Sequence, residues 1–198
     1  MRILNAPVSI SINNEKPGIA VVDSFLGEPM EHREFALGLK YGQKHSVGVR
    51  SEYAYSYREF ELAFSRILQR KIFNWYTGVN GCYQWCNKHQ ELVYHVDRQR
   101  YSAVLFLTPD APHTSGTSFW KSRQSGKREH QSGDSSQTFG PNGEYLKDPD
   151  QWELVDCIGN VFNRLVIFYG QYIHSASEYF GEEVHDSRLF QIFFFDCE

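Results

Sequence analysis

The sequence has no long hydrophobic run and no strong excess of charge of either sign. None of its segments approaches the roughly 20 apolar residues of a membrane-spanning helix, so we expect no membrane anchor. Residues 1–12 have no sustained apolar core of the kind found in signal peptides, which favours a cytoplasmic protein. The formal net charge of −4 over 198 residues favours neither a nucleic-acid partner nor an anionic membrane surface.

Cysteine is also scarce. The four cysteines, Cys82, Cys86, Cys157 and Cys197, do not have the spacing of a zinc finger or zinc ribbon. Because no secretory signal is evident, we expect reduced thiols. The sequence therefore predicts neither a disulfide framework nor a structural zinc site.

The residues that are present describe an ordinary folded chain that is rich in aromatic side chains. Hydrophobic residues make up 41% and charged residues 22%, as in globular proteins. Aromatic residues reach 16%, which suits a sheet-rich interior. We interpret residues 1–198 as one domain, in which 1–80 supply an N-terminal strand and supporting helices. Residues 81–198 form the β-rich core, with a polar insertion at 121–149.

Periodicity predicts one long helix and a series of strands. Apolar residues recur at steps of three and four over 57–76, which is typical of an amphipathic helix, and Gly78 follows as a stop signal. Residues 31–40 and 150–156 have the composition of shorter helices. Runs of aromatic and β-branched residues predict strands at 18–22, 82–85, 91–97, 101–107, 117–120, 164–169 and 188–195. This order indicates a mainly β fold with flanking helices, as a sandwich or barrel.

A histidine and an aspartate at the end of one predicted strand carry the strongest chemical signal. His95 and Asp97 are two residues apart, so in a strand both side chains project from the same face. Together they offer an imidazole and a carboxylate to neighbouring positions of one metal ion. With a second histidine from elsewhere they make the two-histidine, one-carboxylate set of non-haem iron(II) oxygenases, which leaves coordination positions open.

His174 is the candidate for that second histidine. It follows the predicted strand 164–169 after a short turn that contains Gly170. Fourteen residues later Arg188 opens the very apolar last strand. Because a buried guanidinium needs a partner, we expect Arg188 to grip a ligand carboxylate through two parallel hydrogen bonds. His185 is a weaker candidate ligand, since only three residues separate it from Arg188.

In the order of these four residues, the chain resembles the iron(II)/2-oxoglutarate-dependent dioxygenase superfamily. The pattern of that superfamily is His-x-Asp, a long gap, a distal His, and then an Arg or Lys. Within it the chain looks most like short members of the prolyl-hydroxylase-like branch. The matching runs are YSAVLFL at 101–107, GTSFW at 116–120 and NRLVIF at 163–168, followed by His174, Ser175 and Ala176.

The resemblance implies a double-stranded β-helix, or distorted jelly roll, that hydroxylates a C–H bond. The implied cofactors are Fe(II), the co-substrate 2-oxoglutarate and O2, with ascorbate as a candidate reductant. His95, Asp97 and His174 are the implied catalytic iron ligands, and Arg188 binds the far carboxylate of 2-oxoglutarate. Tyr83 or Tyr101 is expected to assist that carboxylate.

Two features affect the expected reaction and substrate. Because Asp97 occupies the carboxylate position, hydroxylation is favoured over halogenation. The chain departs from the prolyl-hydroxylase-like pattern at GTSFW, where a Gly-Gly-x-Thr-type strand is usual, and in the fourteen-residue step from His174 to Arg188. The departure leaves the substrate class open.

Trp120, Arg98 and Gln84 are candidates for lining the substrate pocket, and the insertion 121–149 is a candidate lid. The expected partner is a small molecule or a peptide: an amino acid, a peptide side chain or a natural-product intermediate. The sequence indicates no oligomeric state.

Two other readings remain open. A cupin-type barrel would bind a different metal, but cupins usually require a His-x-His pair and a Glu, and Asp97 argues against this. A non-catalytic binding or structural module of oxygenase-like fold is the second alternative. Metal content and 2-oxoglutarate turnover separate such a module from an enzyme.

Overall fold

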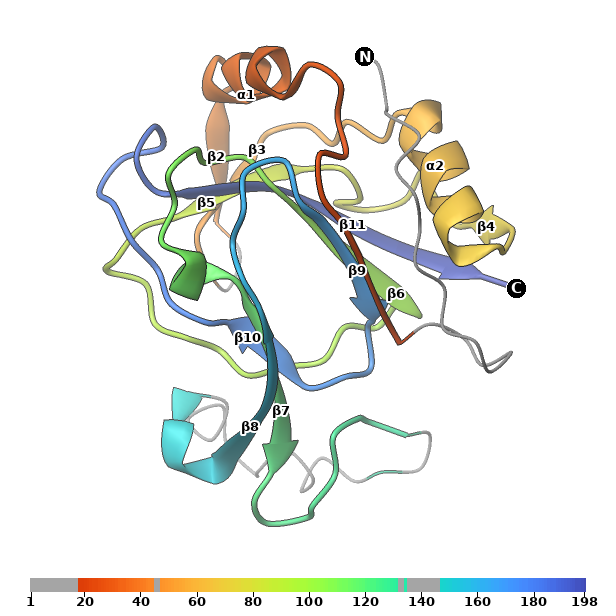
Figure 1. Ribbon diagram of the computed structural model, residues 1–198, viewed down its shortest axis with the longest axis vertical. Coiled ribbons are helices and arrows are strands. Elements are labelled where there is room, and N and C mark those ends of the chain that lie inside the picture. Colours follow the sequence, from red (N-terminus) through yellow and green to blue (C-terminus); the bar gives the residue numbers. More distant parts are fainter. Residues whose placement is uncertain (1–17, 45–46, 132–133, 135–146) are drawn as a thin grey trace.

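The structure is a computed structural model that describes residues 18–44, 47–131, 134 and 147–198. Strands and helices alternate in the first half of the chain, and strands dominate the second (Figure 1). The elements in chain order are β1 (Ile19–Val22), α1 (Pro29–Leu37), β2 (Tyr41–Lys44), β3 (Val49–Ser51), α2 (Arg58–Leu68), β4 (Ile72–Phe73), β5 (Tyr83–Cys86), β6 (Tyr101–Phe106), a 3-10 helix (His113–Ser115), β7 (Thr117–Ser122), a second 3-10 helix (Pro149–Gln151), β8 (Trp152–Ile158), β9 (Leu165–Tyr169), β10 (His174–Ala176) and β11 (Arg188–Cys197).

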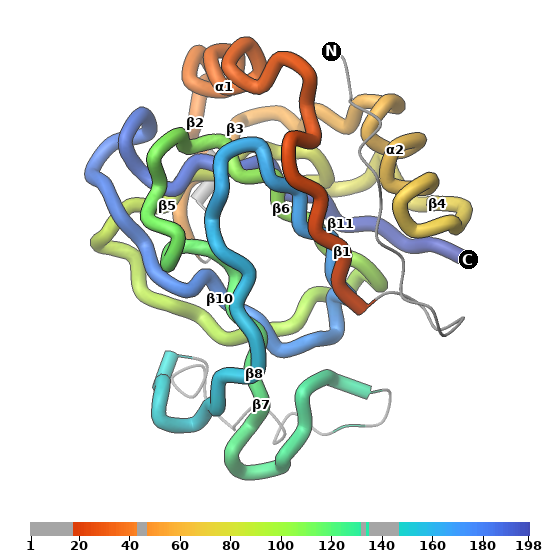
Figure 2. Tube along the Cα trace, viewed as in Figure 1, coloured from red at the N-terminus to blue at the C-terminus, as the bar shows by residue number. Residues whose placement is uncertain are grey.

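The strands form two antiparallel sheets. The longer sheet has the order β1-β9-β6-β11-β5-β3-β2, and β4 pairs with the far end of β11. The shorter sheet has the order β10-β7-β8. Segments far apart in sequence are neighbours in the longer sheet, as β1 beside β9 shows (Figure 2). The predicted fold class, mainly β with flanking helices, is confirmed.

Alternation along β11 gives the longer sheet two different faces. Leu189, Phe193 and Phe195 enter the larger core, which also contains the apolar side of α2. Phe190 and Ile192 point the other way, into a second core that includes side chains of the shorter sheet. Because successive strand residues face opposite sides, one strand serves both cores. The space between the two sheets is where the candidate site lies.

Helix α2 is shorter than its sequence pattern predicts. The stripe Phe60, Phe64, Ile67 and Leu68 is buried as expected, but the helix ends at Leu68, and Gln69 after it adopts a left-handed conformation. The C-terminal part of the predicted helix 57–76 is therefore wrong. Ile72 pairs with the end of β11 and is buried in the larger core, so strand pairing overrides the local helical pattern there.

Two further predictions on secondary structure need correction. The helix expected at 150–156 is largely strand β8, which pairs with β7 along its length. The short strands β2 and β3 have no counterpart among the predicted strands, because runs of three or four residues give almost no periodic signal. Strand β8 pairs with β7 and strand β3 pairs with β5, and both partners are distant in sequence.

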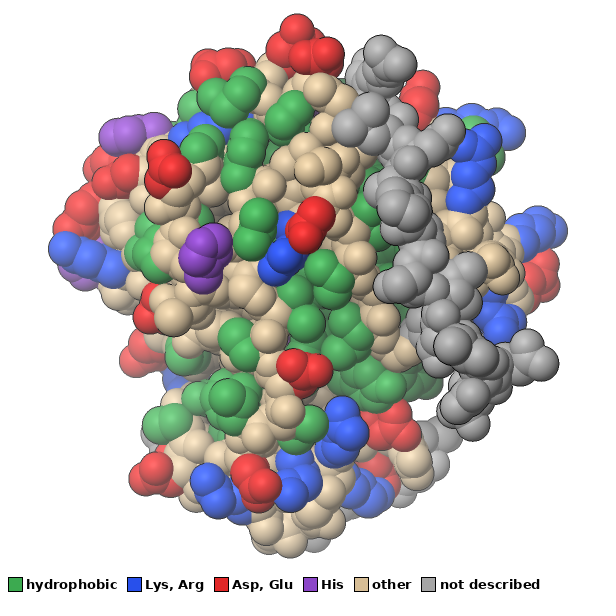
Figure 3. All heavy atoms as spheres, in the orientation of Figure 1, with side chains coloured by type: hydrophobic (Ala, Val, Ile, Leu, Met, Phe, Trp, Pro, Cys, Tyr) green, Lys and Arg blue, Asp and Glu red, His purple; other side chains and the backbone are tan. Residues whose placement is uncertain are grey.

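The surface that Figure 3 shows carries basic and acidic side chains interspersed at its lower end, near the turn after β7. Opposite charges pair there, as in Lys121 with Glu153 at 3.0 Å and Lys127 with Asp134. In the described part of the chain, no helix has the length and apolar character needed to cross a bilayer.

Candidate metal centre

His95 and Asp97 lie on an extended segment that meets β10 at one residue pair. His95 and His174 exchange both backbone N–H···O bonds, at 3.0 and 2.9 Å, and the Asp97 amide donates to the carbonyl of Gly170 at 2.7 Å. The predicted continuous strand over 91–97 is wrong, because only an isolated bridge forms at His95. The extended backbone still directs His95 and Asp97 to the same side.

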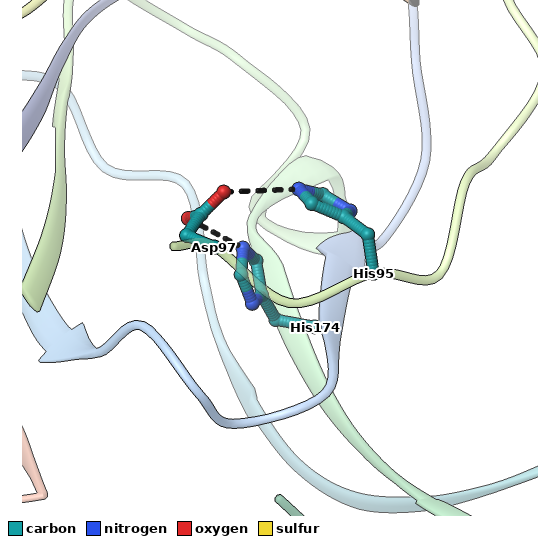
Figure 4. Close-up of side chains that lie close together, drawn as sticks. All are labelled: His95, Asp97 and His174. Carbon is teal, nitrogen blue, oxygen red and sulfur yellow. Dashed lines mark ion pairs between the residues drawn. The ribbon is translucent and has the colours of Figure 1, made fainter. Parts of the chain in front are cut away.

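The three predicted ligands converge on one point between the sheets (Figure 4). One potential ligand atom from each of His95, Asp97 and His174 lies within 4.8 Å of the other two. The Nε2 atom of His95 is 3.8 Å from Asp97 Oδ1, and the Nε2 atom of His174 is 3.3 Å from Asp97 Oδ2. Residues 79 positions apart in the chain thus offer three donor atoms to a shared space.

The hydrogen bonds of the two imidazoles fit a cation in that space. His95 Nδ1 lies 3.0 Å from the carbonyl of Val93, and His174 Nδ1 lies 2.7 Å from the carbonyl of Tyr172. A carbonyl can only accept, so each Nδ1 carries a hydrogen and each neutral ring leaves a lone pair on Nε2. Two lone pairs then face a carboxylate, and a metal ion between them would satisfy all three groups.

The electrostatics keep these groups in their metal-binding forms. The surrounding protein atoms, and then the positive charge that His174 carries when protonated, lower the pKa of His95 below its usual value, although part of the side chain is exposed. Burial raises the pKa of Asp97, but the positive charge that His174 and His95 carry when protonated, together with the hydrogen bonds from His174 and Ser102, outweighs burial and lowers the pKa to about 2. Metal ligands must be deprotonated, so these residues present a neutral imidazole and a carboxylate at neutral pH.

A pocket with a cavity volume of about 120 Å³ adjoins the three residues and opens to solvent. His95 is at the open side, with 43% of its side chain exposed, and His174 is buried. Apolar walls come from Phe168 on β9 and Phe190 on β11. Polar groups project into an otherwise apolar space, as in most ligand sites.

Arg188 lies in the wall of this pocket and is 3% exposed. Its Nε donates to the carbonyl of Ser115 at 2.9 Å and its Nη2 to that of Gly116 at 3.2 Å, and its guanidinium stacks on Phe190. Within the described ranges, no Asp or Glu forms an ion pair with it. Burial lowers the pKa of Arg188, which reflects an uncompensated charge away from water.

Neither predicted tyrosine reaches the pocket. Tyr83 is buried on the helix side of the longer sheet, where its hydroxyl lies 3.0 Å from His32 Nε2. Tyr101 faces the same side and stacks on Phe195. Strand alternation directs both rings away from Arg188, so the structure does not bring Tyr83 or Tyr101 to the pocket.

The three substrate candidates lie in different places. Gln84 lines the pocket. Trp120 is outside the pocket lining, packed edge-on against Tyr94, and donates from Nε1 to Ser175 Oγ at 2.9 Å. Arg98 is exposed and borders a separate surface depression, so the structure does not bring it to the pocket.

The predicted insertion 121–149 begins inside an element, because Lys121 and Ser122 belong to β7. Residues 123–131 follow as a turn that forms backbone hydrogen bonds with other segments of the protein. For example, the amide of Ile173 donates to the carbonyl of Arg128 at 2.9 Å. The part of the predicted lid at 132–133 and 135–146 lies outside the described residues.

Several pocket residues with polar side chains are absent from the predicted site, among them Ser102, Thr117, Arg50 and Tyr179. Ser102 donates to Asp97 Oδ2, and as a polar residue in the apolar strand β6 it gave a usable signal. Thr117 lines the pocket with a buried hydroxyl that has no hydrogen-bond partner among the described residues. Arg50 on β3 and Tyr179 on the loop before β11 also line it. Neither position has a periodic signal that marks it.

Comparison with protein families gives one match. The model described as "Family of unknown function (DUF6445)" covers residues 6–187. The search of curated proteins gave no match.

Three solved structures resemble this chain in fold. HygX from Streptomyces hygroscopicus, with nickel and 2-oxoglutarate bound, has a TM-score of 0.57 at 11% identity over 93% of this chain and 86% of its own. The carbocyclase SnoK from nogalamycin biosynthesis, which is dependent on alpha ketoglutarate, has a TM-score of 0.52 at 12% identity over 95% and 85%. A Trichoplax adhaerens prolyl hydroxylase, in complex with a hypoxia inducible factor peptide fragment, has a TM-score of 0.51 at 11% identity over 90% and 83%. At these identities the likeness shows the double-stranded β-helix fold, and the predicted fold is confirmed.

Proposed function

We propose that this chain, which belongs to the family of unknown function DUF6445, is a non-haem iron(II)- and 2-oxoglutarate-dependent oxygenase. Its reaction would be hydroxylation of a C–H bond in an amino acid, a peptide side chain or a natural-product intermediate. The solved structures of the same fold support the class, and span different substrates. They do not single out the prolyl-hydroxylase-like branch.

One observation carries the proposal: two imidazole lone pairs and a carboxylate face one another across less than 5 Å. Without a cation, three acceptors would meet in a partly buried space, which is unfavourable. His95 and His174 would each bind Fe(II) through Nε2, and Asp97 would bind it through a carboxylate oxygen. The Ser102 hydrogen bond fixes the carboxylate, and backbone carbonyls fix both rings.

The co-substrate site would be the far wall of the pocket. Arg188 has no acidic partner within the described ranges. Thr117 lines the same pocket and follows Gly116, whose carbonyl accepts from Arg188, and its buried hydroxyl has no hydrogen bond there. A carboxylate between them would satisfy both groups. We therefore assign the far carboxylate of 2-oxoglutarate to Arg188 and Thr117, in place of the two tyrosines.

Iron(II) with bound 2-oxoglutarate and O2 supplies an oxidant strong enough to attack a C–H bond. The protein would position the substrate and exclude water from the reacting atoms. Phe168, Phe190 and Ile192 line the pocket with apolar surface and keep water from the reacting atoms. His95 at the open side leaves a path for substrate to approach the metal. Gln84 remains a candidate for substrate contact.

The test is 2-oxoglutarate binding and uncoupled succinate formation by the purified chain with Fe(II) and ascorbate. We expect iron-dependent succinate from the wild type and none from His174→Ala, which lacks one ligand. Arg188→Ala should bind 2-oxoglutarate on the order of 100-fold more weakly, since a buried charge pair loses one partner. Binding is measured by calorimetry with Mn(II) in place of iron.

His89→Ala is the matched control, because this histidine is exposed and pairs with Glu182 away from the pocket. It should behave as the wild type does. If the wild type binds neither metal nor 2-oxoglutarate, the oxygenase proposal fails and a non-catalytic module of this fold takes its place.

A further inference from the structure

The candidate pocket contains a second arginine whose charge the metal and co-substrate do not use. Arg50 lies on β3 and lines the same pocket as Arg188, which lies on β11. The two residues are also at different positions along the strands. The strand register sets Arg50 opposite Gln84 on β5, whereas Arg188 is opposite Cys86 two residues further along. The two guanidinium groups therefore serve different parts of the pocket.

The side chain of Arg50 is held in place but not neutralised. Its Nε donates to Gln84 Oε1 at 2.6 Å, and Gln84 Nε2 in turn donates to the carbonyl of Val47 at 2.8 Å. Over the residues that the structure describes, Gln84 is the one acceptor for this guanidinium, and no carboxylate pairs with it. Most exposed arginines stay free because water solvates them, but Arg50 is partly buried.

Arg50 also acts on the metal-binding residues through its charge. Burial lowers the pKa of Arg50, and weaker contributions from Cys82, Asp97 and Cys86 raise it. Its positive charge is among the groups that lower the pKa of His95, after burial and His174.

The charges of the pocket, the metal and the co-substrate do not balance. The charged side chains that line the pocket are Arg50, Arg188 and Asp97, which sum to one positive charge with neutral histidines. A divalent metal ion raises the sum to three positive charges, and the dianion 2-oxoglutarate lowers it to one. One positive charge remains in a pocket with apolar walls, where an uncompensated charge is unfavourable.

We propose that Arg50, positioned by Gln84, binds a carboxylate group of the oxidised substrate. This inference rests on the proposed function and narrows its substrate class to small organic acids, including amino acids with a free carboxylate. A planar guanidinium matches a carboxylate in shape as well as charge. Substrates whose carboxyl group is blocked as an amide would leave Arg50 unpaired and bind poorly.

The test uses the full chain loaded with Mn(II) and saturating 2-oxoglutarate, with butanoate as the probe and butanamide as its uncharged match. Binding of each is followed by calorimetry in wild type, Arg50→Gln and Arg50→Lys. We expect the wild type to bind butanoate and not butanamide. Arg50→Gln should weaken butanoate binding about tenfold or more, and Arg50→Lys should keep part of it because the charge remains. Arg98→Gln is the control, since Arg98 is exposed outside the pocket.

The affinity for 2-oxoglutarate shows whether Arg50 binds a carboxylate of the substrate or one of 2-oxoglutarate. Arg50→Gln should bind 2-oxoglutarate within about threefold of wild type, whereas Arg188→Gln should lose most of that affinity. If Arg50→Gln loses 2-oxoglutarate to the same extent, Arg50 belongs to the co-substrate site and the inference is overturned. It is also overturned if butanoate does not bind, or binds Arg50→Gln equally well, while metal and 2-oxoglutarate bind normally. If the wild type binds no metal or 2-oxoglutarate, the proposed function falls and this inference falls with it.

Discussion

At the residue scale, a buried histidine outside the site has a measurable role in stability. His32 on α1 is 8% exposed, and its Nε2 lies 2.9 Å from Gln191 Oε1 and 3.0 Å from the Tyr83 hydroxyl. The three side chains form a polar group within the larger, apolar core. Burial lowers the pKa of His32, against a smaller opposing contribution from Gln191.

This makes stability depend on pH in a defined direction. Below about pH 6.5 the unfolded chain takes up a proton on this histidine that the folded chain resists, so the free energy of unfolding falls as pH decreases. Above that pH the contribution is complete. His32→Gln, which does not titrate, should lose less stability between about pH 7.5 and 5.5. Urea unfolding in EDTA at both pH values measures the difference.

His95 also has a lowered pKa, but it is present in both proteins and cancels in the comparison. Equal pH dependence in wild type and His32→Gln would show that His32 does not titrate as its burial implies.

Residue type and spacing were sufficient to predict the candidate metal ligands. His95, Asp97 and His174 were brought out by ligand type and strand geometry, and the structure places their side chains together. Residue type alone does not tell which strand face Tyr83 and Tyr101 occupy, and in the structure both face the helices. A shift of one residue in a strand reverses the direction of the side chain, so type alone could not decide.

At the element scale, the two faces of the longer sheet have different roles: one packs the larger core and the other lines the pocket. Phe64 on α2 is fully buried and packs against Phe193 and Phe195, which point to the helix side of β11. The pocket residues Arg188 and Phe190 project from the other side of the same strand. Changes in the larger core should therefore leave the metal centre in place.

Phe64→Ala should lower the free energy of unfolding by about 3–5 kcal/mol, because it removes a large side chain from a packed core. Leu62→Ala on the same helix is the control, since Leu62 is 47% exposed, and its effect should stay within about 0.5 kcal/mol. Urea unfolding gives both values, and Mn(II) titration should give the wild-type affinity for each variant. A large loss of metal affinity in Phe64→Ala would mean that the two faces are coupled.

Elements were predicted well where a local pattern was long and strong. The strands that became β6, β9 and β11 have continuous apolar and aromatic runs, and their predicted ranges were close. The end of α2 and the identity of β8 depended on pairing with partners far along the chain. Such partners leave no trace in a short local window.

At the scale of the whole molecule, the candidate metal centre links distant parts of the chain. His95 and Asp97 come from the segment before β6, and His174 begins β10 of the shorter sheet. A metal bound by all three would hold the segment 94–97 and the shorter sheet together. An unfolded chain offers no such site, so metal binding contributes to folding stability.

Metal should therefore raise the melting temperature. At a free Mn(II) concentration of about 100 times the dissociation constant, we expect an increase of roughly 5–10 °C over the protein in EDTA. Asp97→Asn and His174→Ala should show little or no increase. A rise of equal size in these variants would place the metal elsewhere on the chain. Differential scanning fluorimetry is sufficient for the comparison.

The fold class was predictable because helices followed by many short strands allow few architectures. The interpretation of residues 1–80 as support and 81–198 as core stays a prediction. The N-terminal part nonetheless supplies β1, β2 and β3 to the longer sheet, and β3 brings Arg50 to the pocket. No sequence pattern connected residue 50 with residue 188, because that proximity arises only when the sheet is assembled.

The paired backbone of His95 and His174 has a consequence for the speed of metal uptake. Their reciprocal hydrogen bonds set the spacing of the two rings before any ion arrives, and His95 remains accessible from solvent. No chain segment has to search for its place. We expect loading of the metal-free protein to follow simple second-order kinetics, limited by encounter and by loss of water from the ion. A chelated sample should then recover within seconds of metal addition rather than on the timescale of refolding.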